Sequence, residues 1–154
     1  MLERLIKTIS TEDTLSLGIR LGQSFQGGEV ICLYGELGAG KTILAKGLGK
    51  GLGVEEEITS PTFTLIREYC AQPTGLRFIH MDLYRLVYPE EAEVIGLTDY
   101  FQDDCVCLIE WPEIIAELLP EDRLEIRIEG SGDLCRLISI VPKGKWEAHE
   151  ILND

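Results

Sequence analysis

The feature that most constrains this chain is the run Gly35-Glu36-Leu37-Gly38-Ala39-Gly40-Lys41-Thr42. It matches the phosphate-loop spacing G-x-x-x-x-G-K-[ST], and it stands between an apolar run at 30–34 and a helix-like segment. Glycines permit a tight turn whose backbone N–H groups point at phosphate oxygens, and the positive end of the next helix faces the same anion. The run therefore predicts a strand, a nucleotide-binding loop and a helix in succession. A plain glycine-rich turn is the alternative.

Two side chains of this loop have individual roles in the prediction. Lys41 is expected to reach the β and γ phosphates as a mobile point charge. The Thr42 hydroxyl is expected to take one position on a Mg²⁺ ion, which prefers oxygen ligands in octahedral geometry. Nucleotide and Mg²⁺ are thus the predicted ligands of the loop.

Composition and charge narrow the class of protein. The chain has 154 residues of ordinary globular composition, which suits a single domain. Its 27 Asp and Glu against 14 Lys and Arg give a net charge of −13. This charge repels nucleic acid and favours a protein partner with a basic face.

The five cysteines are odd in number and lie mostly in apolar runs, which predicts buried thiols in a reducing compartment. The N-terminus shows no apolar leader, so the expected location is the cytoplasm.

The strand-like runs predict a sheet with strands of both directions. An unbroken apolar run at 105–109 is typical of a central buried strand, and alternation at 4–9 predicts an edge strand. Turn residues join two further pairs of runs into expected antiparallel hairpins, 63–70 with 77–81 and 124–128 with 134–141. The predicted fold is α/β: a single P-loop NTPase domain over 1–142 with a mixed parallel and antiparallel central sheet flanked by helices. A frayed C-terminal tail is expected over 143–154.

Capping and glycine signals predict two helices in the first third of the chain. Ser10 and Asp13 have the spacing of a capping box, so a helix is expected to begin there and to end at Gly27-Gly28. A second helix over 43–52 is expected to close at Gly51 and Gly53. Thr11 has two interpretations, because it belongs to the first cap or borders the adenine pocket.

Two carboxylates directly follow strand-like runs, as a metal-dependent nucleotide hydrolase or kinase requires. Asp82 follows 78–81 and Glu110 follows 106–109. Ligands of open α/β sheets lie beyond the carboxyl ends of the parallel strands, where either side chain can arrive. One is expected to hold the metal and the other to act as a base or to orient water. A helix cap or a surface ion pair is the structural alternative for each.

Several neighbouring residues have both a functional and a structural interpretation. Thr62, in a proline-restrained loop, is predicted to sense the γ-phosphate as switch-loop threonines do, or to bond its own backbone. Trp111 is a packed aromatic or part of a face where a partner docks. His80 is expected to be a satisfied strand residue, and Arg85 to pair with Asp82 or another acid. Because the sequence identifies no arginine finger, hydrolysis by the isolated chain is expected to be slow.

Four motifs together carry a family resemblance. They are Gly35-x-Leu37-Gly38-Ala39-Gly40-Lys41-Thr42, Ser60-Pro61-Thr62-Phe63-Thr64-Leu65, His80-x-Asp82-Leu83-Tyr84-Arg85 and Glu110-Trp111-Pro112. In this order they resemble the motif series of the TsaE (YjeE) family, small bacterial ATPases of tRNA threonylcarbamoyladenosine biosynthesis. The resemblance extends from the first strand to at least Arg136.

The resemblance implies more than the spacing of residues does. Lys41 and Thr42 would bind ATP and Mg²⁺, Glu110 matches the acid associated with Mg²⁺, and Asp82 matches the candidate catalytic aspartate. Trp111 matches a residue important to activity. Family members act with the proteins TsaB and TsaD, whose complex modifies adenosine 37 of tRNAs that read codons beginning with A. The ATPase is expected to reset that complex between turnovers.

Two other functions remain open at this point. The same loop would serve a small-molecule or nucleoside kinase, with the segment 82–85 helping to hold an acceptor hydroxyl. Against this, the sequence shows no long arginine-rich lid. A nucleotide-gated binding module with little turnover is the other alternative.

Overall fold

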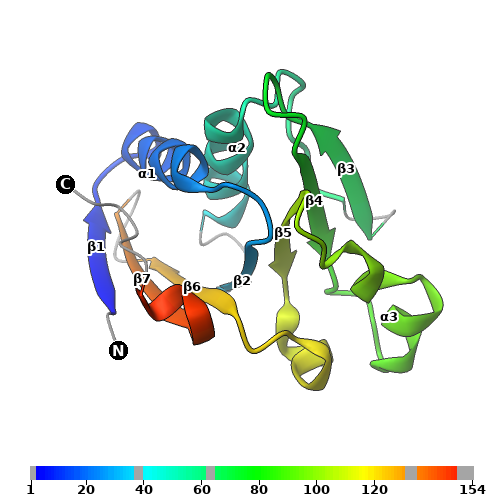
Figure 1. Ribbon diagram of the computed structural model, residues 1–154. Coiled ribbons are helices and arrows are strands. Elements are labelled where there is room, and N and C mark those ends of the chain that lie inside the picture. Colours follow the sequence, from blue (N-terminus) through cyan, green and yellow to red (C-terminus); the bar gives the residue numbers. More distant parts are fainter. Residues whose placement is uncertain (1–2, 37–39, 62–64, 131–134, 149–154) are drawn as a thin grey trace.

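The computed structural model of the chain describes residues 3–36, 40–61, 65–130 and 135–148. They form a seven-stranded sheet in the order β1-β7-β6-β2-β5-β4-β3, with helices on both faces (Figure 1). The strands are β1 (Arg4–Thr8), β2 (Val30–Tyr34), β3 (Ile66–Cys70), β4 (Arg77–Asp82), β5 (Cys105–Glu110), β6 (Arg123–Gly130) and β7 (Arg136–Lys143). The α-helices are α1 (Thr11–Ser24), α2 (Lys41–Leu52) and α3 (Glu90–Val94). The 3₁₀ helices are η1 (Leu97–Tyr100), η2 (Pro112–Leu118) and η3 (Gly144–Ala148).

Strand direction divides the sheet into a parallel centre and antiparallel edges. Strands β6, β2, β5 and β4 are parallel, whereas β3 on one side and β7 on the other run against their neighbours. The edge strand β1 pairs antiparallel with β7. Every residue of β5 is buried, as its unbroken apolar sequence predicts. The carboxyl ends of β2, β4 and β5 therefore meet at one edge of the sheet, the usual position of a ligand site in such folds.

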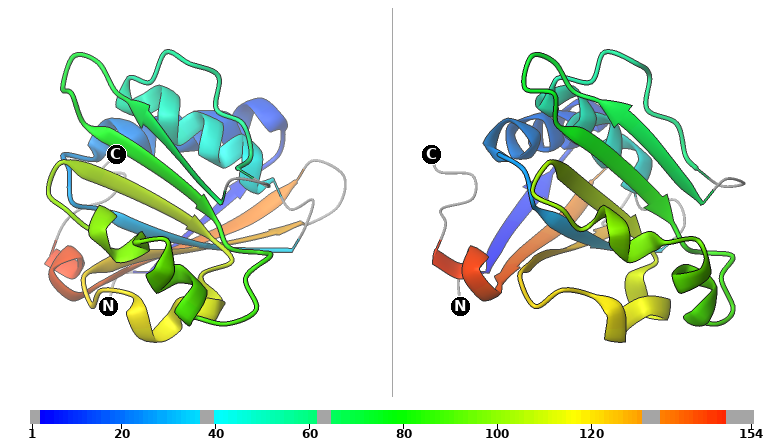
Figure 2. Two further views of the ribbon diagram at one scale, coloured as in Figure 1. Left: turned by 90° about the vertical axis from the view of Figure 1, so that its right-hand side faces the viewer. Right: turned by 45° about the vertical axis from the view of Figure 1, so that its right-hand side comes forward.

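The two faces of the sheet carry different layers, which the two views of Figure 2 show from the side. Helices α1 and α2 cover one face and pack on a cluster that contains Leu21, Leu48 and Ile126. Helices α3, η1 and η2 cover the other face, where Ala92, Leu97 and Ile115 complete a second cluster. The apolar stripe of each helix thus buries itself on the strands beneath it, which holds α2 and the phosphate loop in a fixed position.

Glycines at the contact between α1 and α2 let the two backbones touch. A Cβ added to Gly18 would lie 2.7 Å from the Leu44 carbonyl oxygen, and one added to Gly47 would lie 2.8 Å from the Cα of Gly18. The expectation that Gly51 ends the second helix is wrong, because Gly51 lies inside α2 and faces the Ile19 carbonyl. Small residues therefore place α2 through direct contact with α1.

Other boundaries also differ from the expected ones. Ser10 caps α1 as predicted, with its side chain accepting from the Asp13 amide, but α1 ends at Ser24, before the glycine pair. Strand β7 runs to Lys143 and η3 follows directly, with Trp146 buried against the core under α1 and α2. Regular structure thus continues past 142, where the frayed tail was expected to begin, because an aromatic side chain packs there. No helix among the described residues is long and apolar enough to cross a membrane.

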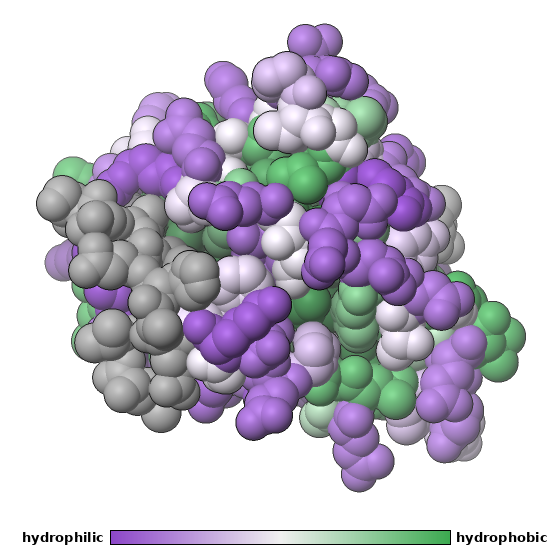
Figure 3. Space-filling model, in the orientation of Figure 1, coloured by the Kyte–Doolittle hydropathy of each residue, from purple (hydrophilic) through white to green (hydrophobic). Residues whose placement is uncertain are grey.

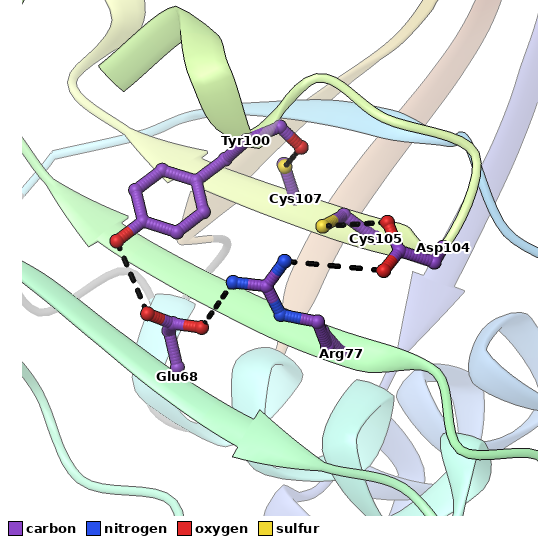
Figure 4. Close-up of polar contacts among 6 residues, drawn as sticks. All are labelled: Glu68, Arg77, Tyr100, Asp104, Cys105 and Cys107. Atoms are coloured by element: carbon purple, nitrogen blue, oxygen red, sulfur yellow. Dashed lines mark hydrogen bonds and ion pairs between the residues drawn. The ribbon is translucent and has the colours of Figure 1, made fainter. Parts of the chain in front are cut away.

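The amino ends of β4 and β5 are joined by a cluster of polar side chains (Figure 4). Arg77 pairs with Glu68 of β3 and lies 3.9 Å from Asp104, between its Nη1 and the Asp104 Oδ2. The Tyr100 hydroxyl donates to Glu68 over 3.1 Å, and the Cys107 thiol donates to the Tyr100 carbonyl over 3.2 Å. This cluster fastens β3, β4, β5 and η1 together at the end of the sheet that lies away from the phosphate loop.

Candidate functional site

The phosphate loop leads directly into α2, whose first residues are Lys41 and Thr42. Gly40 stands before the helix with φ 103°, a left-handed conformation that favours glycine. The first turn of α2 contains no acidic side chain. Its free N–H groups and the positive end of the helix dipole are therefore available to an anion.

A cavity of about 490 Å³ lies at this helix start. Its walls come from five separate parts of the chain: the start of α2, Ser60, the carboxyl ends of β4 and β5, and the beginning of β7. The lining residues are Gly40, Lys41, Thr42, Ile43, Ser60, Asp82, Tyr84, Arg85, Glu110, Trp111 and Arg136. The cavity thus brings together five of the predicted site residues, namely Lys41, Thr42, Asp82, Glu110 and Trp111.

Lys41 is a buried cation in this wall. Its side chain is 6% exposed, and within the described part of the chain its Nζ has no hydrogen-bond partner. The ammonium lies 4.1 Å from the centre of the Trp111 ring, so a cation–π contact holds it in place. A buried ammonium normally has an anionic partner, because desolvation of an unpaired charge is costly. The position of Lys41 thus fits a group that brings negative charge into the cavity.

Asp82 and Glu110 lie side by side in the wall of the cavity that Lys41 also lines. They are aligned as direct partners at the ends of the parallel strands β4 and β5. The Asp82 Oδ1 accepts from the Tyr84 amide over 3.1 Å. Burial raises the pKa of Asp82, the Tyr84 amide lowers it, and the charge of nearby Glu110 raises it. Two adjacent carboxylates in a partly buried site favour a cation or a shared proton between them.

Glu110 is fixed by His80 on the neighbouring strand. The His80 Nε2 and the Glu110 Oε2 are 2.6 Å apart, and both side chains are buried. The contact is diagonal between parallel strands, since His80 is aligned with Leu108, two residues before Glu110. His80 is a buried strand residue, as expected, but the sequence did not indicate this contact because it depends on the pairing of β4 with β5. An imidazole that holds one carboxylate oxygen leaves the other free for a ligand.

Trp111 occupies an unusual backbone position between two cavities. Its φ of 57° and ψ of 53° lie in the left-handed region, which is uncommon for a large side chain. The ring lies 4.9 Å from that of Tyr84 and at 52° to it. A second cavity, of about 390 Å³, is lined by Trp111 together with Gly35 and Glu36 at the start of the phosphate loop. Trp111 thus lines both cavities and contacts Lys41 at the end of the phosphate loop.

Other predicted site residues lie elsewhere or outside the described part of the chain. Leu37, Gly38, Ala39 and Thr62 fall outside the described residues, so their expected roles have no structural counterpart here. Thr11 begins α1 and is absent from the described walls of both cavities.

Sequence reasoning missed Arg136. This residue lines the first cavity, and its Nε would lie 3.3 Å from a Cβ added to Gly40. Arg136 is aligned with Gly130 of β6, and β6 lies beside β2, the strand that leads into the loop. The position of β6 beside β2, which brings Arg136 to the loop, cannot be seen from sequence spacing.

The described residues contain no group of three or more His, Cys, Asp or Glu side chains arranged as a metal site. Mg²⁺ is ordinarily held by one or two protein oxygens together with substrate phosphates and water. The exposed Thr42 hydroxyl and the free oxygen of Glu110, which line the same cavity, fit that pattern.

Comparison with known proteins places this site in a family. The family model described as "Threonylcarbamoyl adenosine biosynthesis protein TsaE" matches residues 8–138. The chain belongs to the TsaE family. This result confirms the resemblance that the four sequence motifs carry.

Relatives from distant bacteria match over most of their length. A Bacillus subtilis protein named tRNA threonylcarbamoyladenosine biosynthesis protein TsaE is 41% identical over 138 residues, which cover 90% of this chain and 85% of the relative. A Treponema pallidum protein of the same name is 42% identical over 131 residues, covering 85% of this chain and 95% of the relative. The crystal structure of Bacillus subtilis YdiB superposes with a TM-score of 0.75 at 38% identity, over 93% of this chain and 87% of that one. The predicted P-loop α/β fold is thereby confirmed.

Proposed function

We propose that this protein is a Mg²⁺-dependent ATPase of tRNA threonylcarbamoyladenosine biosynthesis. The observation that carries the proposal is the buried ammonium of Lys41, which has no hydrogen-bond partner in the described chain and shares its cavity with two adjacent carboxylates. A nucleotide phosphate chain would supply the anion for Lys41, and its metal ion would supply the cation for the carboxylates. The names of the relatives support the pathway.

Each residue has a distinct role in this proposal. Lys41 and the N–H groups at the start of α2 hold the β and γ phosphates. Thr42 and Glu110 hold Mg²⁺, which when bound neutralises charge on the phosphate oxygens. Asp82 orients the attacking water and accepts its proton, a task that its raised pKa suits. His80 keeps Glu110 in place by fixing one of its oxygens.

In this proposal, the cycle of ATP binding and hydrolysis acts on a protein partner. We propose that the chain acts in the cytoplasm on the TsaB–TsaD pair and resets it between rounds of modification of adenosine 37 in tRNAs that read codons beginning with A. The net charge of −13 supports a protein partner, because it repels an RNA ligand. Hydrolysis by the chain alone is expected to be slow and to rise when the partner completes the site.

Phosphate release from ATP tests this function. The purified chain is assayed with Mg²⁺ alone, with the TsaB–TsaD pair, and with a set of nucleosides. A slow release that rises with the pair supports the proposal. Loss of ATP that depends on a nucleoside acceptor, with no free phosphate formed, would instead identify a kinase. Tight ATP binding without any turnover would identify a nucleotide-gated binding module.

A further inference from the structure

Large apolar side chains protrude between the active-site strand β4 and the end of α3. Val87 is 67% exposed, Tyr88 is 65% exposed and Val94 is 87% exposed. Tyr84 and Ile95 are exposed on the same segment, and we name these five residues the α3 surface. Figure 3 shows hydrophobic side chains at the edge of the molecule near α3, bordered by hydrophilic ones. Grouped exposed apolar residues of this kind mark interaction surfaces.

The backbone presents this surface in a fixed shape. The amides of Val87 and Tyr88 donate to the same Glu91 Oε1, over 3.0 and 2.9 Å. Ala92, on the opposite side of α3, is fully buried in the core. Because the segment is already held at both of these points, little of its conformational entropy is lost when a partner binds.

Charge decides what kind of molecule fits this surface. The sequence 84–122 contains eleven Asp and Glu residues against one basic residue, the exposed Arg85, which lies within the segment that carries the surface. On α3 itself Glu90, Glu91 and Glu93 lie among the apolar residues. Such a surface repels nucleic acid and a second copy of itself, and it attracts a protein whose apolar contact area is rimmed by Lys and Arg.

The surface also borders the nucleotide cavity. Tyr84 belongs to both, because it is 55% exposed and lines the cavity. Its ring packs on Trp111, which in turn lies over the Lys41 ammonium. A protein docked on the α3 surface would therefore touch the wall of the cavity at Tyr84.

We propose that the α3 surface is the docking site for the basic-rimmed protein partner of this ATPase. The assignment rests on the proposed function, under which that partner is the TsaB–TsaD pair. Docking there places the partner against the Tyr84–Trp111 wall, where it senses the occupied cavity and completes it. Apart from Tyr84, the surface is distinct from the residues that line the cavity.

The test uses a double variant of the full chain, Val87→Asp with Val94→Asp. Both side chains are largely exposed, so the fold and the ATP turnover of the chain alone are expected to be unchanged. Binding of the purified TsaB–TsaD pair in the presence of ATP, measured by calorimetry, is expected to weaken at least tenfold. Leu5→Asp is the matched control, because Leu5 is 66% exposed on the distant edge strand β1. This variant is expected to bind the TsaB–TsaD pair as tightly as the unaltered chain does.

The outcomes separate this assignment from the proposed function. Tight binding of the pair by both the unaltered chain and the double variant would overturn the docking assignment and leave the ATPase function standing. A chain that hydrolyses ATP but never binds the pair would overturn both the partner and the surface. Equal weakening by Leu5→Asp would also overturn the assignment, because the effect would then be general. The variant Glu90→Lys with Glu93→Lys is expected to weaken binding most at low salt, where charge attraction is least screened.

Discussion

Strands β4 and β5 carry charged groups at both of their ends, and the two ends are built differently. At the amino end, Arg77 is paired with Glu68 and lies near Asp104, and the side chains are partly exposed. At the carboxyl end, the Lys41 ammonium is buried without a hydrogen-bond partner in the described chain, and Asp82 and Glu110 stand side by side. The Glu68 pKa is lowered by its partner Arg77, whereas the Asp82 pKa is raised by burial.

We interpret the amino-end cluster as structural and the carboxyl-end cluster as the ligand site of the proposed function. The charges of the amino end satisfy one another, so they fasten strands and require nothing further. At the carboxyl end, His80 holds Glu110 and the Tyr84 amide holds Asp82, but the buried Lys41 ammonium has no hydrogen-bond partner among the described residues. Burying this ammonium destabilises the free protein, and an anionic ligand that binds there would relieve the cost. Substitutions at the two ends should therefore change different measured quantities.

The largest effect is expected for Lys41→Met at the carboxyl end. ATP turnover should fall by about 100-fold or more, because the charge that stabilises the transferring phosphate is lost. The free energy of unfolding should not fall, because methionine keeps the apolar stem and removes a buried charge. Phosphate release and urea unfolding measure the two quantities. Lys50→Met, an exposed position in the same helix, is the control. Normal turnover by Lys41→Met would refute the phosphate-loop assignment.

The two carboxylates of this end should then separate in their response to Mg²⁺. Glu110→Gln is expected to raise the Mg²⁺ concentration needed for half-maximal turnover by about tenfold or more, because a metal ligand loses its charge. Asp82→Asn should lower the maximal rate and leave the Mg²⁺ requirement nearly unchanged. A Mg²⁺ titration of both variants decides the matter. The reverse order would mean that the two roles are exchanged.

At the amino end, Arg77→Met should leave ATP turnover unchanged and lower the melting temperature slightly. The expected shift is at most about 4 °C, because partly exposed ion pairs contribute little to stability. Scanning calorimetry measures the melting temperature, and the phosphate assay measures ATP turnover on the same preparation. Arg67→Met, an exposed position on β3, is the control. A large loss of turnover would show that the two ends are coupled through the strands.

The smallest effect concerns the pH dependence of stability. The hydrogen bond from Arg77, with that from Tyr100, lowers the pKa of Glu68 in the folded protein. Glu68 therefore stabilises the fold above its unfolded pKa of about 4.3, and this contribution disappears as pH falls through the lower folded value. Melting temperatures of the unaltered chain and Glu68→Gln should differ at pH 7 and converge near pH 3. A difference that persists at low pH would contradict the ion-pair explanation.

Local signals were sufficient for the elements of the fold and for much of the site. The phosphate-loop spacing, the apolar run of β5 and the turn residues of two hairpins predicted a mixed sheet, and the carboxylates Asp82 and Glu110 follow strands that are indeed neighbours. These features depend on residues close in sequence, where spacing and propensity operate.

Contacts between distant segments could not be predicted in this way. The His80–Glu110 pair depends on strand alignment, and Arg136 reaches the loop because β6, the hairpin partner of β7, pairs with β2. Gly51 gave the same signal as a helix end, although its real role is contact with α1. Contacts of this kind depend on how distant segments pack, and residue spacing along the sequence does not determine that packing.

The pairing of β1 with β7 has a consequence for how the protein is made. During synthesis β1 leaves the ribosome long before its partner β7, which ends at Lys143 and is followed by the buried Trp146. The nascent chain must therefore carry an unpaired edge strand, with an exposed leucine, until β7 has been translated. A chain stalled or cut before β7 would lack both the strand that shields this edge and the arginine that borders the phosphate loop, so incomplete products should neither fold fully nor bind nucleotide as the finished protein does.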